Sequence, residues 1–396
     1  MQNAFAATLA LALSMGATIG DIPVRAQAVD SQMEARETQL IEQIADNFIA
    51  QGRLEAVSIG VVHNGRSATV HAGPLYRDGP ETANDRTIFE LRSITKTFIG
   101  TLAAQAILDE NISLNTDIRE YLGPGFDNLE RDGQPILVRH LLTHTSGLPS
   151  NNPLPANLDQ PAPGDDAGGI AWRTFRDVEM GMTREKFFAN LRGFELASVP
   201  GQEFNYSNLG TNLTALILER VYDRSLDELV AEFITGPAGM NDTVLAMTEP
   251  DALARLASGY NERGERIDPW PVWPMGGAEG AAKAPLPDTI RYMQFHLSER
   301  NPAVRLSHVP LHELAWDYRI ASFWWNIDRP AGSTSFRHDG GYANVRNVMI
   351  LFPEEDMGIY VVTNRVNPEA NEILTEMVHI IRSQLLSADD ADAAES

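Results

Sequence analysis

The spacing of apolar residues predicts helices at both ends of the chain and in its middle. Between Gln32 and Gln51, apolar residues recur every three or four positions, which gathers them on one face of an amphipathic helix. Pro368–Leu386 shows the same period. Ser93–Leu108 and Leu213–Val221 also read as helices, and both are strongly apolar.

Strand patterns occur near both ends of the chain. Val57–Val62 and Ser67–His71 flank Asn64-Gly65, a pair that tolerates the positive φ angles of a tight hairpin. Four later segments read as consecutive strands: Ala321–Asp328, Ser333–Arg337, Asn344–Phe352 and Met357–Thr363. If these terminal strands pair with the early hairpin, the sheet lobe is discontinuous in sequence. The middle of the chain then forms a mostly helical lobe.

Three segments lack the periodicity of helices and strands. Asn151–Gly169 is rich in Pro, Asn, Asp and Gly, and Asp268–Pro287 has a similar composition with two tryptophans. The first of these loops lies where a lid or pocket wall would lie. Residues 387–396 are small and acidic, which predicts a disordered tail.

Composition narrows the possible partners. At 396 residues the chain can build a large core, divided between two lobes. Its 31 basic and 54 acidic residues give a net charge of −23, spread along the chain. Such a field repels phosphate backbones and anionic lipids, which argues against nucleic acid or a membrane surface as partner. The lack of cysteine excludes disulfides, a cysteine nucleophile and thiolate metal sites, and it is silent on compartment.

Residues 1–28 are predicted to be a secretory signal peptide. Ala4–Ile19 is an apolar run too short to span a membrane comfortably, and Ala26-Gln27-Ala28 offers a small-x-small cleavage site. The mature protein would begin at Val29, insert in no membrane, and be secreted or periplasmic. Because Met1-Gln2-Asn3 lacks Lys or Arg, an uncleaved anchor is the alternative.

The first chemical signal is Ser93-Ile94-Thr95-Lys96 at the start of a predicted helix. Positions i and i+3 share a helix face, so the Ser93 hydroxyl and the Lys96 amine come within reach of each other. A serine hydroxyl becomes nucleophilic when a base takes its proton, and a desolvated lysine can be neutral enough to act as that base. Alone, the pattern arises by chance, and Ser93 reads more readily as a helix N-cap.

Two further motifs make the signal specific. Tyr206-Ser207-Asn208 precedes an apolar helix, and His338-Asp339-Gly340-Gly341 precedes a strand. Ser-x-x-Lys, Tyr-x-Asn and a polar residue-x-Gly, in this order, resemble the SxxK serine hydrolases of the β-lactamase and penicillin-binding-protein superfamily. The nearest group is the class C β-lactamases with their D-aminopeptidase, D-Ala carboxypeptidase and esterase relatives. The resemblance spans roughly Ala56–Leu385 and includes Leu141–Pro149 and Val361–Arg365.

The resemblance implies the fold and its division. The expected class is α+β, an α/β sandwich of the β-lactamase/transpeptidase type, in which an antiparallel sheet is flanked by helices and joined to a mostly helical lobe. The catalytic unit would span residues 29–386, with the sheet lobe at about 32–90 and 305–386 and the helical lobe at about 91–304. No cofactor is expected.

The resemblance also implies residue roles. Ser93 would attack a carbonyl to form an acyl-enzyme, with Lys96 and Tyr206 as proton handlers. A phenol near an ammonium can lose its proton below its usual pKa of about 10, so Tyr206 would activate Ser93 or protonate the leaving group. Asn208 would point into the same cleft. Read alone, Lys96 is a solvated surface lysine, but a helix threading between the lobes would bury it; Tyr206 read alone is a core tyrosine.

His338 departs from the pattern, because β-lactamases and most penicillin-binding proteins carry lysine there. A fixed ammonium suits a substrate carboxylate, whereas histidine is only partly charged near neutral pH. A His-x-Gly motif resembles D-aminopeptidases and esterase-like members, which puts efficient β-lactam hydrolysis in doubt. Gly340 and Gly341 would let substrate approach the strand edge, and the Gly341 and Ser93 amides would form the oxyanion hole.

Other candidate residues carry weaker signals. His140 and His144 stand at i and i+4, as zinc ligands sometimes do, but no Glu follows His140 and no third ligand is apparent. They fit better on a helix at the lobe boundary than in a metal site. Trp324 and Trp325 either line the cleft or fill the sheet core.

Two functional hypotheses follow. The first is a serine hydrolase acting on an amide or ester in a small molecule or peptide, with D-amino-acid peptides, peptidoglycan fragments or small esters as substrates. The alternative is a β-lactamase, or a penicillin-binding sensor that acylates without turnover. The motifs do not separate them, because deacylation depends on water placement rather than on further residue types.

Overall fold

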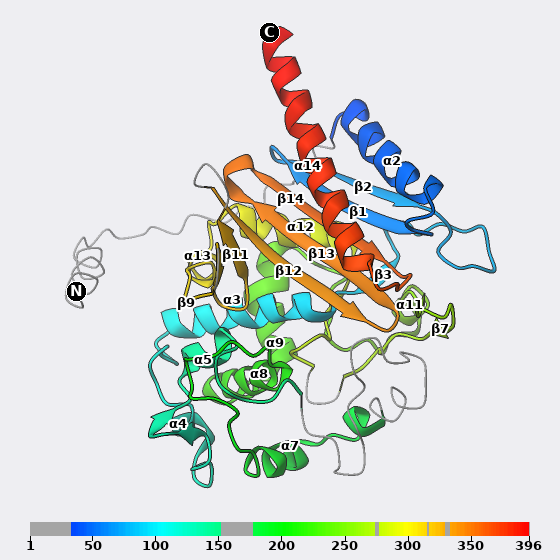
Figure 1. The fold of residues 1–396 in the computed structure, drawn as a ribbon. Coiled ribbons are helices and arrows are strands. Elements are labelled where there is room, and N and C mark those ends of the chain that lie inside the picture. The colour runs from blue at the N-terminus through cyan, green and yellow to red at the C-terminus, as the bar shows by residue number, and fades with distance from the viewer. Residues whose placement is uncertain (1–32, 152–176, 274–276, 315–316, 329–332, 396) are drawn as a thin grey trace.

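The computed structural model of the protein describes residues 33–151, 177–273, 277–314, 317–328 and 333–395. The predicted signal peptide and almost all of the predicted loop 151–169 lie outside the described residues. An eight-stranded sheet stands above a lobe of helices (Figure 1). Its strand order is β2-β1-β14-β13-β12-β11-β10-β9, and every neighbouring pair is antiparallel. The α+β class predicted from the sequence is confirmed.

The early hairpin and the terminal strands share the sheet, as predicted. Asn64 and Gly65 have φ angles of 51° and 71°, so the turn between β1 and β2 adopts the left-handed conformations that its sequence favours. Of the predicted strand Ala321–Asp328 only the second half is extended. The strands of the sheet are β1 (Val57–His63), β2 (Arg66–Ala72), β9 (His312–Glu313), β10 (Tyr318–Ile320), β11 (Trp325–Asp328), β12 (Thr334–Tyr342), β13 (Val345–Phe352) and β14 (Met357–Thr363).

Helices from both ends of the chain cover one face of this sheet. α2 (Ala35–Ala50) and α14 (Ala370–Glu395) lie side by side over it, and α12 (Leu286–Leu297) lies against the other face (Figure 1). The predicted period explains the packing, because the apolar stripes of α2 and α14 meet strand side chains in one buried cluster. Pairing of β1 with β14 brings the two ends together.

The predicted disordered tail is wrong for residues 387–395, which continue α14. Alanine is the strongest helix former, and Ala388, Ala391, Ala393 and Ala394 alternate there with acidic residues. A helix already anchored by packing extends at little cost, because the unfavourable nucleation step has been completed. Among the described residues, no helix has both the length and the apolar character needed to cross a bilayer.

The helical lobe is built around α3 (Thr95–Leu108), which is buried on nearly all sides. At Gly100 an added Cβ would lie 2.0 Å from the Ser322 carbonyl oxygen, so glycine lets the helix touch the chain that leads into β11. The other helices are α4 (Arg119–Leu122), α5 (Val138–Leu142), α7 (Arg184–Leu191), α8 (Asn208–Tyr222), α9 (Leu226–Val230), α10 (Gly236–Ala238), α11 (Pro250–Leu253) and α13 (Pro302–Ser307). Short turns are the 3₁₀ segments Arg92–Ile94 and Pro353–Glu355 and the π segment Ala231–Thr235.

In the described part of the chain, three two-stranded sheets lie outside the main sheet. β3 precedes the Ser-x-x-Lys motif and pairs with β8, whose backbone therefore runs beside that motif. These pairs are β3 (Ile88–Glu90) with β8 (Lys283–Pro285), β4 (Glu130–Arg131) with β5 (Gln134–Pro135), and β6 (Gly259–Tyr260) with β7 (Arg266–Ile267).

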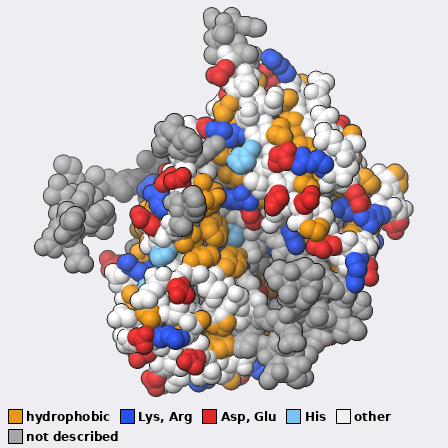
Figure 2. Space-filling model, in the orientation of Figure 1, with side chains coloured by type: hydrophobic (Ala, Val, Ile, Leu, Met, Phe, Trp, Pro, Cys, Tyr) orange, Lys and Arg blue, Asp and Glu red, His pale blue; other side chains and the backbone are white. Residues whose placement is uncertain are grey.

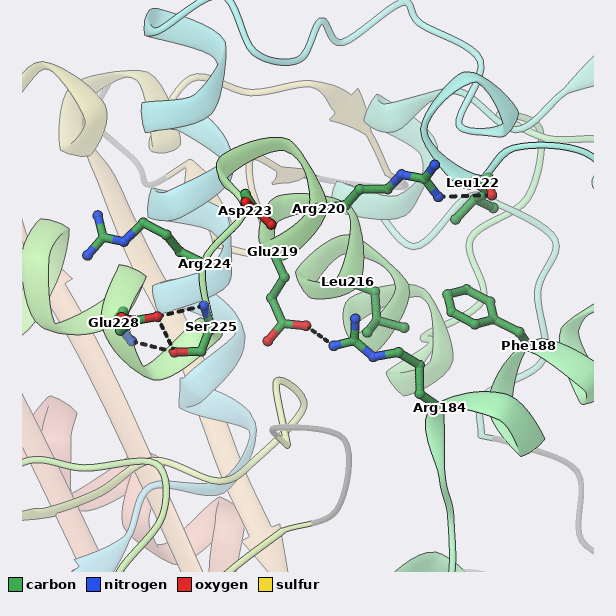
Figure 3. Close-up of a pocket in the computed structure, with 10 residues that line it drawn as sticks. All are labelled: Leu122, Arg184, Phe188, Leu216, Glu219, Arg220, Asp223, Arg224, Ser225 and Glu228. Atoms are coloured by element: carbon green, nitrogen blue, oxygen red, sulfur yellow. Dashed lines mark hydrogen bonds and ion pairs between the residues drawn. The ribbon is translucent and has the colours of Figure 1, made fainter.

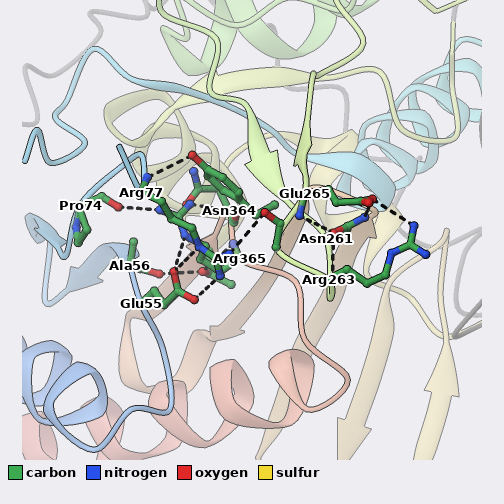
Figure 4. A network of polar contacts seen from close by, with 12 residues as sticks. Glu55, Ala56, Pro74, Arg77, Asn261, Arg263, Glu265, Asn364 and Arg365 are labelled. Carbon is green, nitrogen blue, oxygen red and sulfur yellow. Dashed lines mark hydrogen bonds and ion pairs between the residues drawn. The ribbon is translucent and has the colours of Figure 1, made fainter. Parts of the chain in front are cut away.

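A polar network secures the end of β14 (Figure 4). The buried Arg365 donates from Nε to Glu55 at 3.1 Å and from Nη2 to the Pro74 carbonyl at 3.0 Å. Arg77 Nε donates to the same Glu55 carboxylate at 2.8 Å. Asn364 donates to the carbonyl oxygens of the loop after β2 and of the chain entering β6. The Val361–Arg365 segment thus ties together three stretches that are distant in sequence.

Gly340 lets strand β12 lie directly on the chain that precedes Ser93. An added Cβ would sit 2.3 Å from both the Leu91 carbonyl oxygen and Asn347 Oδ1. The same asparagine donates from Nδ2 to the Glu90 carbonyl at 3.1 Å, which pins β13 to that stretch as well.

We therefore expect Gly340→Ala to lower the free energy of unfolding by about 1–3 kcal/mol, the usual cost of overpacking a tight contact. Urea unfolding followed by circular dichroism measures this change. Gly79→Ala is the control, because no atom lies within 4 Å of its added Cβ. Equal stability of the two variants would show that β12 and the Leu91 backbone are free to separate.

Candidate active site

Ser93 and Lys96 meet at the junction of the two lobes. Ser93 lies in the 3₁₀ turn Arg92–Ile94, and Lys96 lies in the first turn of α3. Lys96 Nζ donates to Ser93 Oγ at 3.2 Å and to the Glu279 carbonyl oxygen at 2.8 Å. The structure thus brings together the hydroxyl and amine that the i, i+3 spacing predicts. Ser93 stays partly exposed, and its hydroxyl does not cap the helix.

Burial sets the proton affinity of Lys96. Its side chain is fully buried, and desolvation lowers its pKa from 10.5 to about 7, although the Glu279 carboxylate acts in the opposite direction. A large fraction of Lys96 is therefore neutral near pH 7. The reading of Lys96 as a solvated surface residue is wrong, because α3 runs through the core.

Tyr206 completes the group. Lys96 Nζ lies 4.9 Å from the centre of its ring, and the Ser93 hydroxyl is close enough to act on the pKa of its phenol. The expectation of a lowered pKa is wrong. Desolvation raises the pKa of Tyr206 above its usual 10, outweighing the effect of the Ser93 hydroxyl that would lower it. In the free protein Tyr206 is a neutral phenol, so Lys96 is the better proton acceptor of the two.

The His144 ring packs against the Tyr206 ring. Its ring centre lies 4.4 Å from that of Tyr206, and the Ser207 amide donates to its Nδ1 at 3.1 Å. Helix α5 ends at Leu142, and His144 has a φ of 57°, so His140 and His144 do not share a helix face as predicted. The described residues that could jointly hold a metal ion are instead Glu37, His63 and Asp389, outside this site.

Arg92 shapes the turn that carries Ser93, and sequence reasoning missed it. Its φ is 51°, and its side chain is only 2% exposed. The guanidinium donates to Glu90 Oε2 at 2.9 Å and to Asn344 Oδ1 at 3.2 Å, and it lies 4.4 Å from the centre of the Tyr342 ring. A buried charge held by a carboxylate and an aromatic ring resists movement. Arg92 therefore anchors the residue next to the nucleophile.

Asn208 makes its side-chain hydrogen bond to a neighbouring asparagine and not to Lys96. Its Nδ2 donates to Asn151 Oδ1 at 2.7 Å. One helical turn further along α8, Asn212 Nδ2 donates to Glu279 Oε2 at 2.8 Å. The sequence signal that could have found Asn212 is its i+4 spacing from Asn208, which places both on one face of α8.

Glu279 is the second residue that sequence reasoning missed. It lies in the predicted loop Asp268–Pro287, so its proximity to Lys96 depends on tertiary structure. Desolvation raises the pKa of its carboxyl, while the Lys96 ammonium and the Asn212 amide act to lower it. Burial and the Glu279 charge raise the pKa of Glu179 to about 8. Lys96 therefore titrates together with a small group of acids rather than alone.

His338 is buried and neutral. Its Nδ1 donates to the Asp339 carbonyl at 2.8 Å, which leaves Nε2 as an unprotonated acceptor without a partner in the described structure. Desolvation and the Lys96 charge lower its pKa to about 4. The expectation of partial charge near neutral pH is wrong, because burial and the nearby Lys96 ammonium both disfavour the charged form of the imidazole.

A cavity of about 440 Å³ opens beside these groups. Trp325, the first residue of β11, lines it, whereas Trp324, which precedes the strand, is fully buried in the core. Hydrophobic side chains gather where β11 and β12 approach the helical lobe (Figure 2). The lining residues are Tyr206, Tyr318, Trp325, Ile327, Arg337, His338 and Asp339.

A second hollow of about 600 Å³ lies on the helical lobe (Figure 3). Its lining includes neither Ser93, Lys96 nor Tyr206. Arg184 pairs with Glu219 across it, and the Ser225 and Glu228 side chains satisfy each other's backbone amides at the start of α9. These charged groups serve the packing of helices, so the cavity beside Tyr206 is the candidate active site.

Comparison with known proteins identifies the family. Residues 41–380 match the protein family described as Beta-lactamase. Protein flp of Staphylococcus aureus is 24% identical over 88% of this chain and 66% of its own length. The D-alanyl-D-alanine-carboxypeptidase/endopeptidase AmpH of Escherichia coli is 25% identical over 74% of this chain and 76% of its own. This chain thus spans about two thirds of the length of flp and about three quarters of AmpH.

Solved structures show the same fold. The beta-lactamase/D-alanine carboxypeptidase of Yersinia pestis, complexed with citrate, superposes with a TM-score of 0.74 at 20% identity, covering 88% of this chain and 98% of that chain. A class C beta lactamase of Rhodobacter sphaeroides superposes with a TM-score of 0.70 at 18% identity, covering 87% and 99%.

The burial of Lys96 predicts the pH dependence of acylation. If neutral Lys96 accepts the Ser93 proton, kcat/KM rises as pH increases through about 7. Glu279→Gln removes a charge that favours the ammonium, so the rise should move to lower pH. Glu42→Gln, an exposed residue of α2, is the control. A profile that is flat in the wild type, or unmoved by Glu279→Gln, would contradict the assignment of Lys96.

Proposed function

The chain belongs to the β-lactamase family of serine hydrolases, and we propose that it cleaves an amide or ester bond through an acyl-enzyme on Ser93. The observation that carries the proposal is the hydrogen bond between Ser93 and a fully buried lysine whose pKa lies near 7. Such a pair lets the hydroxyl attack at neutral pH without a cofactor.

The proposed acylation moves one proton and exchanges one bond. Ser93 Oγ bonds to the substrate carbonyl carbon as its proton passes to neutral Lys96. The Ser93 and Gly341 amides hold the oxyanion, and the carbon–leaving-group bond then breaks. The leaving group takes a proton from the Lys96 ammonium through the hydroxyl of Tyr206, a residue that lines the cavity. In deacylation water attacks the acyl carbon while neutral Lys96 takes its proton, and the bond to Ser93 Oγ breaks as Ser93 regains a proton.

The proposed substrates are peptides containing D-amino acids, peptidoglycan fragments or small esters. The relatives and solved structures that resemble this chain include a D-alanyl-D-alanine carboxypeptidase/endopeptidase and a class C beta lactamase. A neutral His338 stands where lysine would supply a cation for a carboxylate, which favours an esterase or D-aminopeptidase over a β-lactamase. The alternative of a penicillin-binding sensor that acylates and stalls needs the same groups. We further propose that the protein is exported by its first 28 residues and acts as a secreted or periplasmic enzyme.

The nucleophile is tested by Ser93→Ala. We expect loss of covalent acylation and a fall in turnover of roughly 10⁶-fold, as seen when nucleophiles are removed from serine hydrolases. Intact-protein mass spectrometry after incubation with a β-lactam, a p-nitrophenyl ester and D-alanyl peptides measures the adduct. The same spectra separate a hydrolase, which releases the adduct, from a sensor, which keeps it. Near-normal turnover by Ser93→Ala would refute the mechanism.

His338→Lys tests what the neutral imidazole does. A lysine at this position adds a cation that an anionic substrate can reach, so kcat/KM for a penicillin or a C-terminal D-alanine peptide should rise relative to a neutral ester. Both substrates are measured with wild type and variant at the same pH. His338→Gln, which adds no charge, is the control. If the ratio of kcat/KM for the anionic substrate to that for the neutral ester is unchanged in His338→Lys, the side chain at this position does not select substrates by charge.

A further inference from the structure

The cavity beside Tyr206 has an apolar wall that the proposed chemistry does not use. Tyr318 is 43% exposed and Phe204 36% exposed, which is unusual for large apolar side chains next to a buried catalytic group. The Phe204 and Trp325 rings meet edge to face with centroids 5.4 Å apart. Phe204 comes from the chain just before Tyr206, so this contact joins the wall to the catalytic residues.

The strand register explains why Trp325, Ile327 and Tyr318 face the same space, and Phe204 joins them through its contact with Trp325. Trp325 and Ile327 stand two residues apart on β11, so they share one face of the sheet. Tyr318 lies directly opposite Ile327, and Arg337 lies directly opposite Trp325. A cross-strand pair places its side chains side by side. The wall is therefore a continuous surface on three neighbouring strands.

The two charged residues beside the wall, Arg337 and Asp339, pair with each other. Arg337 donates to both oxygens of Asp339, from Nε at 2.8 Å and from Nη2 at 2.7 Å, and to Thr375 Oγ1 at 3.0 Å. A bidentate pair of this kind satisfies the charge of both partners. A charged substrate group would have to displace one of them, whereas an uncharged group would not.

We propose that Trp325, Phe204, Tyr318 and Ile327 form a subsite for an uncharged aryl group of the substrate. This proposal rests on the proposed function, because the subsite orients the bond that Ser93 attacks. A cavity of about 440 Å³ suits a small molecule, since ligand sites usually measure roughly 300–1,000 Å³. Its continuity with Tyr206 and His338 assigns the wall to substrate rather than to a protein partner.

The test compares matched esters in wild type and Trp325→Ala. Ethyl phenylacetate and ethyl acetate differ on the acyl side, and phenyl acetate and ethyl acetate differ on the leaving-group side. We expect Trp325→Ala to lower kcat/KM for one aryl ester by at least about 10-fold relative to ethyl acetate, in line with loss of apolar contact in a specificity pocket. Trp325→Phe should restore most of the loss. Leu253→Ala, which truncates an exposed apolar side chain outside the cavity, should change the kcat/KM of neither ester.

A second measurement does not depend on turnover. Calorimetric titration of Ser93→Ala with the preferred aryl ester should show binding that Ser93→Ala/Trp325→Ala weakens by at least about 10-fold. The subsite would be overturned if Trp325→Ala lowered kcat/KM equally for aryl and ethyl esters, or if the affinity for the aryl ester did not change on loss of Trp325. Either result would count against the subsite even if Ser93 is the nucleophile. Absent turnover in wild type, with Trp325-dependent binding retained, would refute the proposed function and leave the subsite supported.

Discussion

The site depends on keeping the Lys96 amine out of water. A lysine on the surface would hold its proton until about pH 10 and could not accept one from serine. Here α3 carries it through the core, where its remaining hydrogen bonds are to Ser93 and the Glu279 carbonyl. Burial of an ionisable group is costly, and the surrounding packing has to support it. The all-round burial of α3, the glycine contact at Gly100 and the closely packed β12 strand provide that support.

The nucleophile turn is held from both lobes. On the sheet side, Gly340 and Asn347 press β12 and β13 onto the residues before Ser93. From the connecting loop, the Ala282 amide donates to Thr95 Oγ1 at 3.0 Å, and the Leu91 amide donates to the Ala282 carbonyl at 2.8 Å. The active site is therefore fixed by tertiary contacts that converge on one turn. Small movements between the lobes would alter the distance from Ser93 to its partners.

Much of this arrangement could be predicted from local sequence. The hairpin at Asn64-Gly65, the amphipathic end helices and the i, i+3 placement of Ser93 and Lys96 follow from short-range rules, and the structure shows all three. What failed depended on burial by distant segments. Desolvation raises the pKa of Tyr206, which was expected to fall, and desolvation together with the Lys96 charge lowers the pKa of His338, which was expected to be partly charged. Glu279 and Arg92 escaped notice because their roles depend on partners far away in sequence.

The pairing of β1 with β14 has a consequence for how the protein forms. The Thr363 hydroxyl donates to the Ala56 carbonyl across 307 residues of sequence, and the whole of β1 gains its second neighbour only from that end of the chain. During synthesis the β1–β2 hairpin emerges early. The edge of β1 that pairs with β14 stays unpaired until almost the entire protein has been made. Contacts of such long range form slowly, and an unpaired edge invites association with other chains. The sheet lobe is thus the last part to close, and its exposed early hairpin is the segment that needs protection until then.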